Sequence, residues 1–503
     1  MLEIIARAEK FGTKTAIINH QSNSYSYEDL LIISERIAQQ LLGNKTDLNQ
    51  KPIPFITPSN FEYVATLFGI WSAGGIAVPL CSSHPIPEWQ YVLQDINAQQ
   101  MIFHSDFQEK INTLSQSENN EITFLKLTDL TTEKKCSESL KSTQLPDIKE
   151  DRKALIIYTS GSTGKPKGVV TSHKIIKSQI QTLTQAWEWT SQDFILNILP
   201  LHHIHGIVNV LLCCLWSGAK CLMLPRFDAS QVWQLFQEEK LTLFMAVPTI
   251  YNRLIADYEK ADFSQKKLFS ESCQDFRLMI SGSAALPVSV LETWENISKH
   301  TLLERYGMSE VGMAISNPYK GKRLAGFVGK PLPNTEIVLL NDDGKKSKIG
   351  EQGEIHIKGR NVFLEYWNKE KATAEAFKNG WFVTGDIATL NKKGYYKIVG
   401  RKSVDIIKTG GYKVSALEIE EVLRTHSAIK ECAVVGLLDK NWGQKVAVLI
   451  VLEKHNVLKL NDLRNWAKSK LAVYKIPSEM LTTKELPKNI LGKVIKKDII
   501  KLF

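Results

Sequence analysis

The part of the sequence most informative about the fold is the stretch Tyr158-Thr-Ser-Gly-Ser-Thr-Gly-Lys-Pro-Lys-Gly168. It follows an apolar run at residues 154–158 and precedes residues 173–186, whose spacing predicts a helix. Its small residues let backbone amides approach an anion, while hydroxyl groups and charge come from Ser160, Ser162, Thr163, Lys165 and Lys167. A Walker A loop needs Ser or Thr after its lysine, whereas Pro166 stands there. The stretch could be a plain surface loop, but its place after a buried strand favours a phosphate loop of another type.

Strand and helix patterns alternate on both sides of this loop. Helical spacing covers residues 30–42, and residues 71–79 read as a helix end followed by a short strand. Further strand-like runs lie at residues 241–247, 276–280 and 354–357. This alternation predicts an α/β fold with a large, multi-subdomain N-terminal domain of layered α/β sheets whose strands are largely parallel.

A smaller unit is expected from Gly400 onward. Ser415-Ala-Leu-Glu418 predicts a capping box that opens a helix, and strands at 433–437 and 446–451 and a helix at 463–471 follow. We therefore expect an N-terminal domain at residues 1–399 and a small mobile α+β domain at residues 400–503. The polar stretch 107–150 is expected to be a surface connector.

Composition limits the class of protein. With 503 residues and 43% hydrophobic content, the chain is typical of a globular protein with more than one domain. The apolar run at residues 207–219 is shorter than the roughly 20 residues that span a bilayer. The seven cysteines show no paired metal spacing, which indicates reduced, buried thiols. No secretory signal is evident, so we expect a cytoplasmic protein, or a mitochondrial matrix protein if the chain is processed.

The net charge of +10 is unevenly distributed. Residues 397–503 hold 21 Lys and Arg against 11 Asp and Glu, which leaves 42 of each kind in the rest of the chain. Most of these lysines are expected to be solvated, but a basic module could also close over polyanions such as ATP or coenzyme A. Nucleic-acid binding is not expected, because the lysines are spread out without a recognised motif.

Further motifs occur in order along the chain: Leu199-Pro-Leu-His-His-Ile-His-Gly206, Glu304-Arg-Tyr-Gly-Met-Ser-Glu310, Thr384-Gly-Asp386, Gly400-Arg401 and Pro487-Lys-Asn-Ile-Leu-Gly-Lys493. Together with the phosphate loop they resemble the adenylate-forming superfamily, which holds acyl-CoA synthetases, peptide-synthetase adenylation domains and luciferases. The resemblance covers nearly the whole chain. It implies an enzyme that makes an acyl-adenylate from ATP and then transfers the acyl group to a thiol.

The resemblance also assigns roles to residues of the first half-reaction. The residues implied to bind ATP are Thr159, Ser160, Gly161, Ser162, Thr163, Gly164, Lys165, Tyr306, Gly307, Asp386 and Arg401. Glu310 is suited to hold Mg²⁺, and the Ser309 hydroxyl can reach the α-phosphate. Lys493 is the mobile cation that stabilises charge on the transition state. His203 is expected to gate the pocket.

The second half-reaction is assigned to Lys408-Thr-Gly-Gly-Tyr-Lys413, which resembles the glycine loop that lines the coenzyme A tunnel after domain rotation. Lys408, Gly410 and Gly411 are the expected contacts, because glycines allow close backbone approach. The stretch from Arg401 to these glycines is one residue longer than the common pattern. The hinge position is then Ser403 or one of its neighbours.

Within the superfamily the closest resemblance is to malonyl-CoA synthetases of the animal mitochondrial type. A malonate substrate leaves one carboxylate charged in the pocket, which requires a fixed cation. Arg323 is the first candidate and Arg277 the second, since the planar guanidinium fork fits a carboxylate. His205, Ser281 and Met308 are expected to line the acyl pocket, whereas His202 is expected only to pack.

Several alternatives stay open. Methylmalonate or another short or medium-chain acid is the nearest alternative substrate. A peptide-synthetase adenylation module and a long-chain acyl-CoA synthetase are rival enzymes. A non-catalytic nucleotide-binding protein belongs to another class, although the presence of Lys493, Glu310 and Asp386 argues against it. The expected partners are therefore small molecules, and the sequence makes no prediction of oligomeric state.

Overall fold

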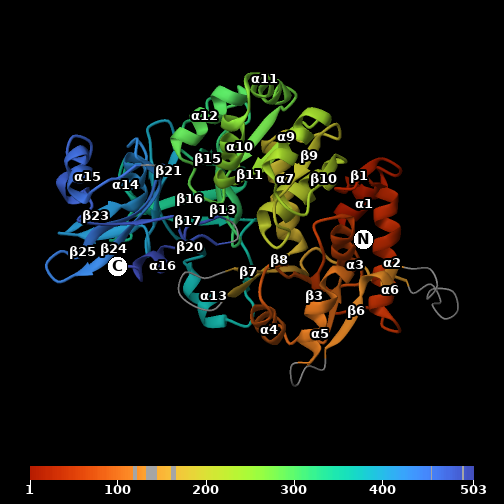
Figure 1. The fold of residues 1–503 in the computed structure, drawn as a ribbon. Helices are drawn as coiled ribbons and strands as arrows, with labels where there is room; N and C mark the ends of the chain where they lie inside the picture. Colours follow the sequence, from red (N-terminus) through yellow and green to blue (C-terminus); the bar gives the residue numbers. More distant parts are fainter. Residues whose placement is uncertain (117–121, 132–143, 160–165, 455, 490–491) are drawn as a thin grey trace.

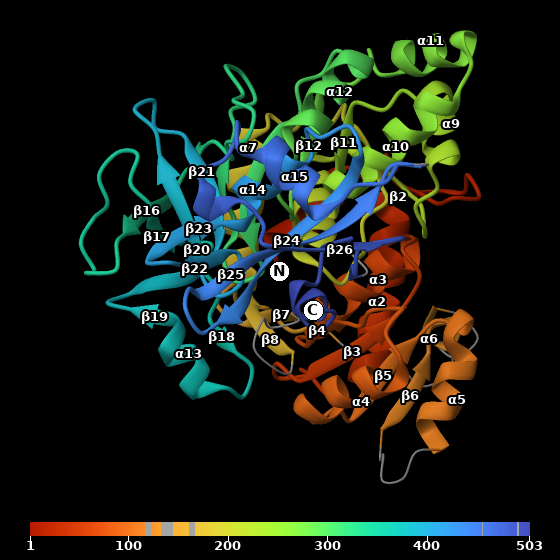
Figure 2. The same ribbon diagram turned by 60° about the vertical axis from the view of Figure 1, so that its left-hand side comes forward.

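A computed structural model describes residues 1–116, 122–131, 144–159, 166–454, 456–489 and 492–503. It shows an α/β protein with a large N-terminal domain of layered sheets and helices and a small C-terminal domain (Figure 1). The C-terminal domain, drawn in blue, lies at one end of the molecule in Figure 1 and comes forward in Figure 2. Within the described residues, the helices are too short or too polar to cross a membrane.

The first sheet has seven strands in the order β18-β8-β7-β4-β3-β5-β6. Their bounds are β3 (Pro52–Ile56), β4 (Ile76–Pro79), β5 (Gln100–Phe103), β6 (Thr123–Lys126), β7 (Lys153–Thr159), β8 (Lys167–Ser172) and β18 (Glu365–Tyr366). The strands from β7 to β6 are parallel, as predicted, but β8 pairs antiparallel with β7. The phosphate loop therefore joins two paired strands, and β8 stands between the loop and the predicted helix.

The second sheet has nine strands in the order β15-β14-β13-β12-β11-β9-β10-β1-β2. Their bounds are β1 (Thr15–Ile18), β2 (Ser24–Ser26), β9 (Phe194–Asn197), β10 (Lys220–Met223), β11 (Leu243–Ala246), β12 (Leu278–Ser281), β13 (Leu303–Met308), β14 (Gly312–Ser316) and β15 (Lys330–Pro331). The run from β1 to β13 is parallel, and antiparallel strands close both ends. Parallel strands align their carboxyl ends, so β12 and β13 deliver their last residues to one edge.

Helices cover these sheets, as Figure 1 shows. They are α1 (Glu3–Glu9), α2 (Tyr27–Leu42), α3 (Phe61–Ser72), α4 (Ile86–Asp95), α5 (Gln108–Gln116), α6 (Leu127–Thr131), α7 (His173–Ala186), α8 (Cys213–Ser217), α9 (Ala229–Glu238), α10 (Pro248–Lys260), α11 (Phe263–Ser272), α12 (Val288–Ser298) and α13 (Glu370–Ala376). A short 3₁₀ turn, η1 (Ser105–Phe107), precedes α5. A core of Trp233, Tyr251 and Trp294 from α9, α10 and α12 packs against the second sheet.

The sequence predictions of helices at residues 30–42 and 173–186 are confirmed by α2 and α7. The prediction of a mere connector at residues 107–150 is wrong for its first part, because β6 pairs with β5 as the edge of the first sheet. The apolar run at residues 207–219 is helical and fully packed: η3 (His205–Leu212) is a π-helix that leads into α8. π-helical turns are rare and frequent at functional sites.

A third, antiparallel sheet contains β16 (Thr335–Leu340), β17 (Gly353–Gly359), β19 (Phe377–Lys378), β20 (Trp381–Leu390) and β21 (Tyr396–Arg401). Asp386 on β20 stands opposite Arg401 at the end of β21. These two residues, which are 15 apart in the sequence, are therefore direct neighbours on adjacent strands of this sheet. The chain leaves the third sheet at Arg401.

The C-terminal domain is a five-stranded sheet with helices. Its elements are β22 (Ile406–Thr409), β23 (Tyr412–Ser415), α14 (Ala416–Leu423), β24 (Ile429–Asp439), β25 (Gly443–Leu452), α15 (Leu460–Ala467), η4 (Val473–Lys475), β26 (Glu479–Thr483) and α16 (Lys496–Ile500). Only half of the predicted capping box forms. Ser415 accepts from the Glu418 amide, but the Glu418 carboxylate pairs with Lys475 instead.

Candidate active site

The nucleoside side of the site is built where the second and third sheets meet. The phenol of Tyr306 on β13 donates a 2.6 Å hydrogen bond to Oδ2 of Asp386, and the Arg401 guanidinium reaches Oδ1 at 3.3 Å. Burial raises the pKa of Asp386, and the Arg401 charge acts against that rise. The structure thus brings together three residues that were predicted to bind the nucleotide. The arrangement is suited to a carboxylate that accepts hydrogen bonds from the ribose hydroxyls.

Close backbone packing continues along β13. A Cβ atom on Gly307 would lie 2.0 Å from the carbonyl oxygen of Gly312 on β14, so no larger residue fits there. Glycine at this position lets β14 fold back directly onto the motif, which sets the place of Tyr306. Gly307 therefore affects the site through the close packing of its backbone against β14.

The predicted metal ligand, Glu310, is buried. Its Oε1 accepts a 2.9 Å hydrogen bond from the Tyr366 phenol, and burial raises its pKa while that bond lowers it. One buried carboxylate fits Mg²⁺ that takes its other ligands from phosphate oxygens and water. Among the described residues no group of three or more metal-ligating side chains exists, so such an ion would depend on the nucleotide.

Ser309 directly precedes this carboxylate in the chain. Ser309 lines a small cavity of about 10 Å³ together with Thr171 and Asn361. Thr159 is the last residue of β7 and opposes Lys167 on β8. The rest of the predicted phosphate loop, Ser160, Gly161, Ser162, Thr163, Gly164 and Lys165, lies outside the described residues.

The predicted catalytic lysine approaches from the C-terminal domain. Its positive charge is close enough to Asp386 to lower the pKa of that carboxyl. The neighbouring Gly492 has φ of +73°, and a Cβ there would lie 2.7 Å from Oγ1 of Thr249 at the start of α10. The loop that bears Lys493 thus lies against the N-terminal domain, on the side of the nucleotide residues.

A buried arginine that was not predicted lies on the opposite face of β13 from Tyr306. Arg305 is 3% exposed, and none of its three guanidinium nitrogens has a hydrogen-bond partner among the described residues. Burial lowers its pKa to about 9, so it still carries a proton at neutral pH. An unpaired buried charge is strongly unfavourable, which indicates that an anion belongs beside it.

The surroundings of Arg305 are polar and similarly unpaired. Gly282 lies directly against the guanidinium, and the buried Ser281 hydroxyl has no partner among the described residues. His205 Nδ1 lies 3.2 Å from Oγ of Ser283, while its Nε2 is buried without a described partner. Burial and then the Arg305 charge hold the pKa of His205 well below its usual range, so the ring is neutral. His205, which was predicted, thus lies near a residue that was not. Ser281 pairs with Glu304, so its side chain shares the face of Glu304 and not that of Arg305.

Two further histidines precede this group. The rings of His202 and His203 lie 4.2 Å apart, and His202 lies 6.1 Å from His84. Burial and the neighbouring His84 lower the pKa of His203 to about 4. Both rings are therefore neutral at physiological pH and suited to packing and gating.

The two arginines predicted for the acid are engaged elsewhere. Arg323 donates to the carbonyl oxygens of Pro318, Thr301 and Tyr319. Arg277 forms a two-pronged ion pair with Asp193, at 2.7 Å and 2.8 Å, and also donates to the Trp187 carbonyl.

These contacts give both arginines a structural role in this arrangement and leave Arg305 as the better candidate. The sequence could have indicated Arg305, because it stands between two motif residues on a strand, where alternate side chains face opposite sides. Met308, the remaining predicted pocket residue, packs partly buried against the core of the third sheet.

The predicted coenzyme A loop is the turn between β22 and β23. Gly410 and Gly411 have φ of +55° and +83°, values that favour glycine. Gly410 lies against the Trp442 ring, and the exposed Lys408 precedes it. Lys413 pairs with Asp342 of the N-terminal domain. In this arrangement Lys413 ties the loop to the N-terminal domain.

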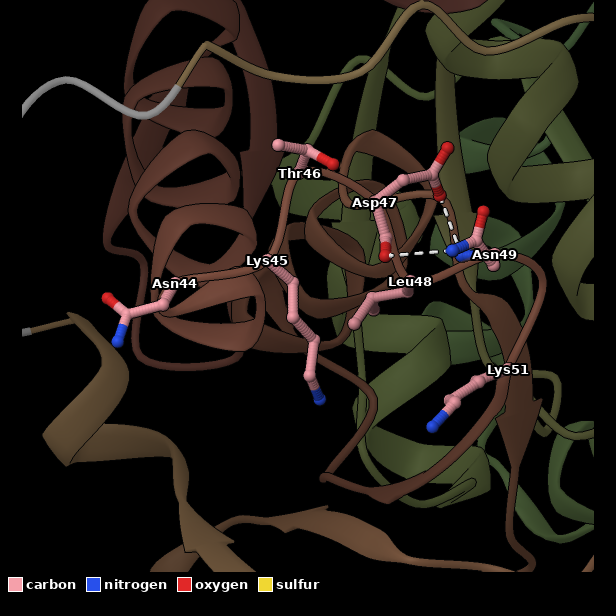
Figure 3. A pocket seen from close by; sticks show the side chains of 7 residues that line it. All are labelled: Asn44, Lys45, Thr46, Asp47, Leu48, Asn49 and Lys51. Carbon is pink, nitrogen blue, oxygen red and sulfur yellow. Dashed lines mark hydrogen bonds between the residues drawn. The ribbon is translucent and has the colours of Figure 1, made fainter.

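A surface depression of about 380 Å³ lies elsewhere, at the loop before β3 (Figure 3). It is lined by Asn44, Lys45, Thr46, Asp47, Leu48, Asn49 and Lys51. The hydrogen bonds between Asp47 and Asn49 that Figure 3 draws order the loop itself. Arg152 forms an ion pair with the Asp47 carboxylate. None of the motif residues contributes to it, so it is separate from the candidate active site.

Comparison with solved structures agrees with this geometry. ATP-bound MatB from Rhodopseudomonas palustris has a TM-score of 0.90 at 29% identity, covering 99% of this chain and 98% of that one. Its apo form has a TM-score of 0.80 at 28% identity with the same coverage. MenE from Bacillus subtilis with ATP and magnesium ion has a TM-score of 0.84 at 26% identity, covering 99% and 98%.

Sequence comparison extends over the whole chain. It is 41% identical over 99% of its length to "Malonate--CoA ligase ACSF3, mitochondrial" of Xenopus laevis and covers 92% of that protein. The AMP-binding enzyme model matches residues 4–367, and the AMP-binding enzyme C-terminal domain model matches residues 418–493. This chain, whose nucleotide motifs converge at the junction of its second and third sheets, belongs to the AMP-binding enzyme family.

Proposed function

We propose that this protein is an ATP-dependent malonate–CoA ligase that works through a malonyl-AMP intermediate. The observation that carries the choice of acid is Arg305. Its buried guanidinium has no described partner, lies beside Gly282, and is close enough to His205 to lower the pKa of that ring. A carboxylate fits the guanidinium fork with two hydrogen bonds, and the second carboxylate of malonate would supply one. The full-length likeness to a named malonate–CoA ligase supports the same substrate.

In the first half-reaction, a carboxylate oxygen of the acid attacks the α-phosphorus of ATP and pyrophosphate leaves. No general base is needed, since a carboxylate is already a nucleophile at neutral pH. Lys493 supplies positive charge at the reacting phosphate, and Asp386, Arg401 and Tyr306 hold the nucleoside. Mg²⁺ near Glu310 would neutralise phosphate charge when bound.

In the second half-reaction, the coenzyme A thiol loses its proton to water, its sulfur attacks the acyl carbon, and the bond from that carbon to the phosphate oxygen breaks, so that AMP leaves as the anion. We propose that residues 400–503 rotate against residues 1–399 between the steps and bring Lys408, Gly410 and Gly411 to the acyl group. The higher TM-score to the ATP-bound than to the apo form of MatB supports an adenylating arrangement here. Because Arg401 binds Asp386 in this arrangement, the hinge would follow it, at Ser403 or a neighbour.

An acid panel tests this function. Pyrophosphate release is measured with malonate, methylmalonate, propionate, octanoate and palmitate, with and without coenzyme A. We expect the highest kcat/KM with malonate and thioester product only when coenzyme A is present. A preference for propionate would refute the malonate assignment but not the ligase. No release with any acid, despite ATP binding, would favour a non-catalytic nucleotide-binding protein.

The compartment is a separate proposal. The Xenopus laevis relative is named as mitochondrial, which supports the mitochondrial matrix rather than the cytoplasm as the first place to look. Fractionation of cells that carry the native gene, followed by immunodetection of this chain, tests it. Recovery in the cytosolic fraction alone would contradict the matrix proposal.

A further inference from the structure

The buried ammonium group of Lys496 lies three residues after Lys493, at the start of α16. Lys496 is 8% exposed, and its Nζ lies 2.7 Å from Oδ1 of Asp405 and 2.8 Å from Oε1 of Glu420. Burial alone would lower the pKa of Lys496, but the two carboxylates together raise it. Lysine is rarely buried unless paired, and here one lysine joins two carboxylates from different elements.

The first carboxylate leads to the ribose residues. Oδ2 of Asp405 accepts a 2.9 Å hydrogen bond from the Arg401 amide, while Oδ1 faces Lys496. Asp405 also packs tightly against Gly400, because a Cβ atom added to Gly400 would lie 2.5 Å from the Cβ atom of Asp405. Because Arg401 meets Asp386 through its side chain, the Lys496 ion pair reaches the nucleotide site through Asp405.

The second carboxylate leads to the domain core and to its interface. Glu420 accepts from the Val434 amide at 2.9 Å and pairs with Arg424 at 3.1 Å. Its neighbour Glu421 accepts a 3.0 Å hydrogen bond from the Val288 amide, at the first residue of α12 in the N-terminal domain. Lys496 therefore connects the end of the catalytic loop to Asp405 and to Glu420, whose neighbour Glu421 contacts the N-terminal domain.

The catalytic loop also has contacts that do not involve Lys496: Gly492 lies against Thr249, and Lys488 pairs with Glu431. Lys493 donates its amide to Oδ1 of Asn489, and the Ile495 amide donates to the Pro487 carbonyl. These bonds shape the loop but do not tie it to the ribose residues. The described link from the loop to Arg401 within the C-terminal domain runs through Lys496.

From this geometry we infer that Lys496 is a positioning residue, which holds the Lys493 loop in register with Arg401 and Asp386 through its ion pair with Asp405. The inference rests on the proposed adenylate-forming activity. It assigns Lys496 to the first half-reaction only, because the Arg401–Asp386 contact belongs to the arrangement in which Lys493 faces the nucleotide.

The test is Lys496→Met, assayed separately in both half-reactions with the acid that the wild type adenylates best. We expect kcat for pyrophosphate release to fall about 10- to 100-fold with little change in KM for ATP, since small misplacement of a catalytic group has effects of this size. Thioester formation from supplied acyl-adenylate should stay within twofold, and Lys496→Arg should restore most of kcat. Lys501→Gln is the matched control, because Lys501 is an exposed residue of the same C-terminal segment, paired with Asp498.

A second variant isolates the ion pair. Asp405→Asn keeps an oxygen that accepts from the Arg401 amide but removes the charge that faces Lys496. It should reproduce the selective loss, and the double variant with Lys496→Met should be no slower than Lys496→Met alone. Equal loss in both half-reactions together with a lower Tm would overturn the inference, as would full activity of both single variants. Choosing the acid by wild-type rate keeps this outcome independent of whether malonate is the substrate.

Discussion

Arg305 lies so close to Gly282 that a methyl group on that glycine would sit 2.6 Å from the guanidinium carbon. The glycine therefore leaves the space in which the buried guanidinium lies flat beside the backbone. Gly282 follows the carboxyl end of β12, and Arg305 stands next to that end on the neighbouring parallel strand β13, since Ser281 pairs with Glu304. The arrangement presents a cation without a described partner near the edge where α/β sheets bind their ligands.

Replacing Arg305 by Met should separate activity from stability. Loss of the partner for the distal carboxylate should reduce kcat/KM for malonate by about 3–5 kcal/mol and leave propionate little changed. Tm should not fall, because removing an unpaired buried charge is neutral or stabilising. The measurement is the malonate-to-propionate ratio together with a thermal melt.

Arg323→Met is the matched control. Its guanidinium serves three main-chain carbonyls, so we expect a lower Tm and an unchanged malonate-to-propionate ratio. This reverses the expectation from the sequence, which placed Arg323 at the substrate. A ratio that changes in Arg323→Met but not in Arg305→Met would return the role to Arg323.

Gly282→Ala tests the same pocket without removing charge. The new methyl group should push the Arg305 guanidinium aside, because 2.6 Å is too short for any real contact. We expect KM for malonate to rise about tenfold or more, by roughly 1.4 kcal/mol, with KM for ATP unchanged. An equal rise in both KM values would indicate a general distortion instead.

Lys493→Ala should abolish adenylate formation and spare the second step. Removing the cation that we propose for the α-phosphate should slow pyrophosphate release by about 100-fold or more. Thioester formation from supplied malonyl-AMP should continue. Lys484→Ala, an exposed lysine upstream in the C-terminal domain, serves as the control. Loss of both half-reactions would argue against a role limited to the first.

Glu304 makes stability depend on pH. Burial raises its pKa from 4.5 to about 7, and Glu421 of the C-terminal domain adds to the rise. The folded protein then binds a proton that the unfolded chain has lost above pH 4.5, so stability falls as pH rises from 4.5 to about 7 and levels off above it. Relative to Glu304→Gln, wild type should lose on the order of 2–3 kcal/mol between pH 5 and pH 8. Parallel shifts of Tm in both proteins would contradict this.

Domain rotation can be trapped at Lys413 and Asp342, which meet across the domains. Cysteines at both positions, joined by a short bismaleimide, should leave a single turnover of pyrophosphate release intact and block thioester formation. The native cysteines that the structure describes are buried, which limits side reactions. Unimpaired thioester formation after complete cross-linking would show that the rotation is not needed.

The sequence alone named the residues that the structure brings together around Asp386. Gly307, Asp386 and Arg401 belong to short motifs whose chemistry depends on residue type and on neighbours in the chain. The phosphate loop after a buried strand and the spacing of α2 and α7 likewise depend on local pattern. Such features are readable because backbone geometry repeats along the chain.

The acid half that we propose depends on contacts that only the folded chain makes. Every arginine has the same fork, and what distinguishes Arg305 is the lack of a described partner, while Arg277 meets Asp193 across 84 residues of chain. The strand β8 inserted after the phosphate loop and the edge strand β6 were also set by pairing with distant strands. Whether a buried charge is paired depends on groups that folding brings together from far along the chain, and no local pattern records that.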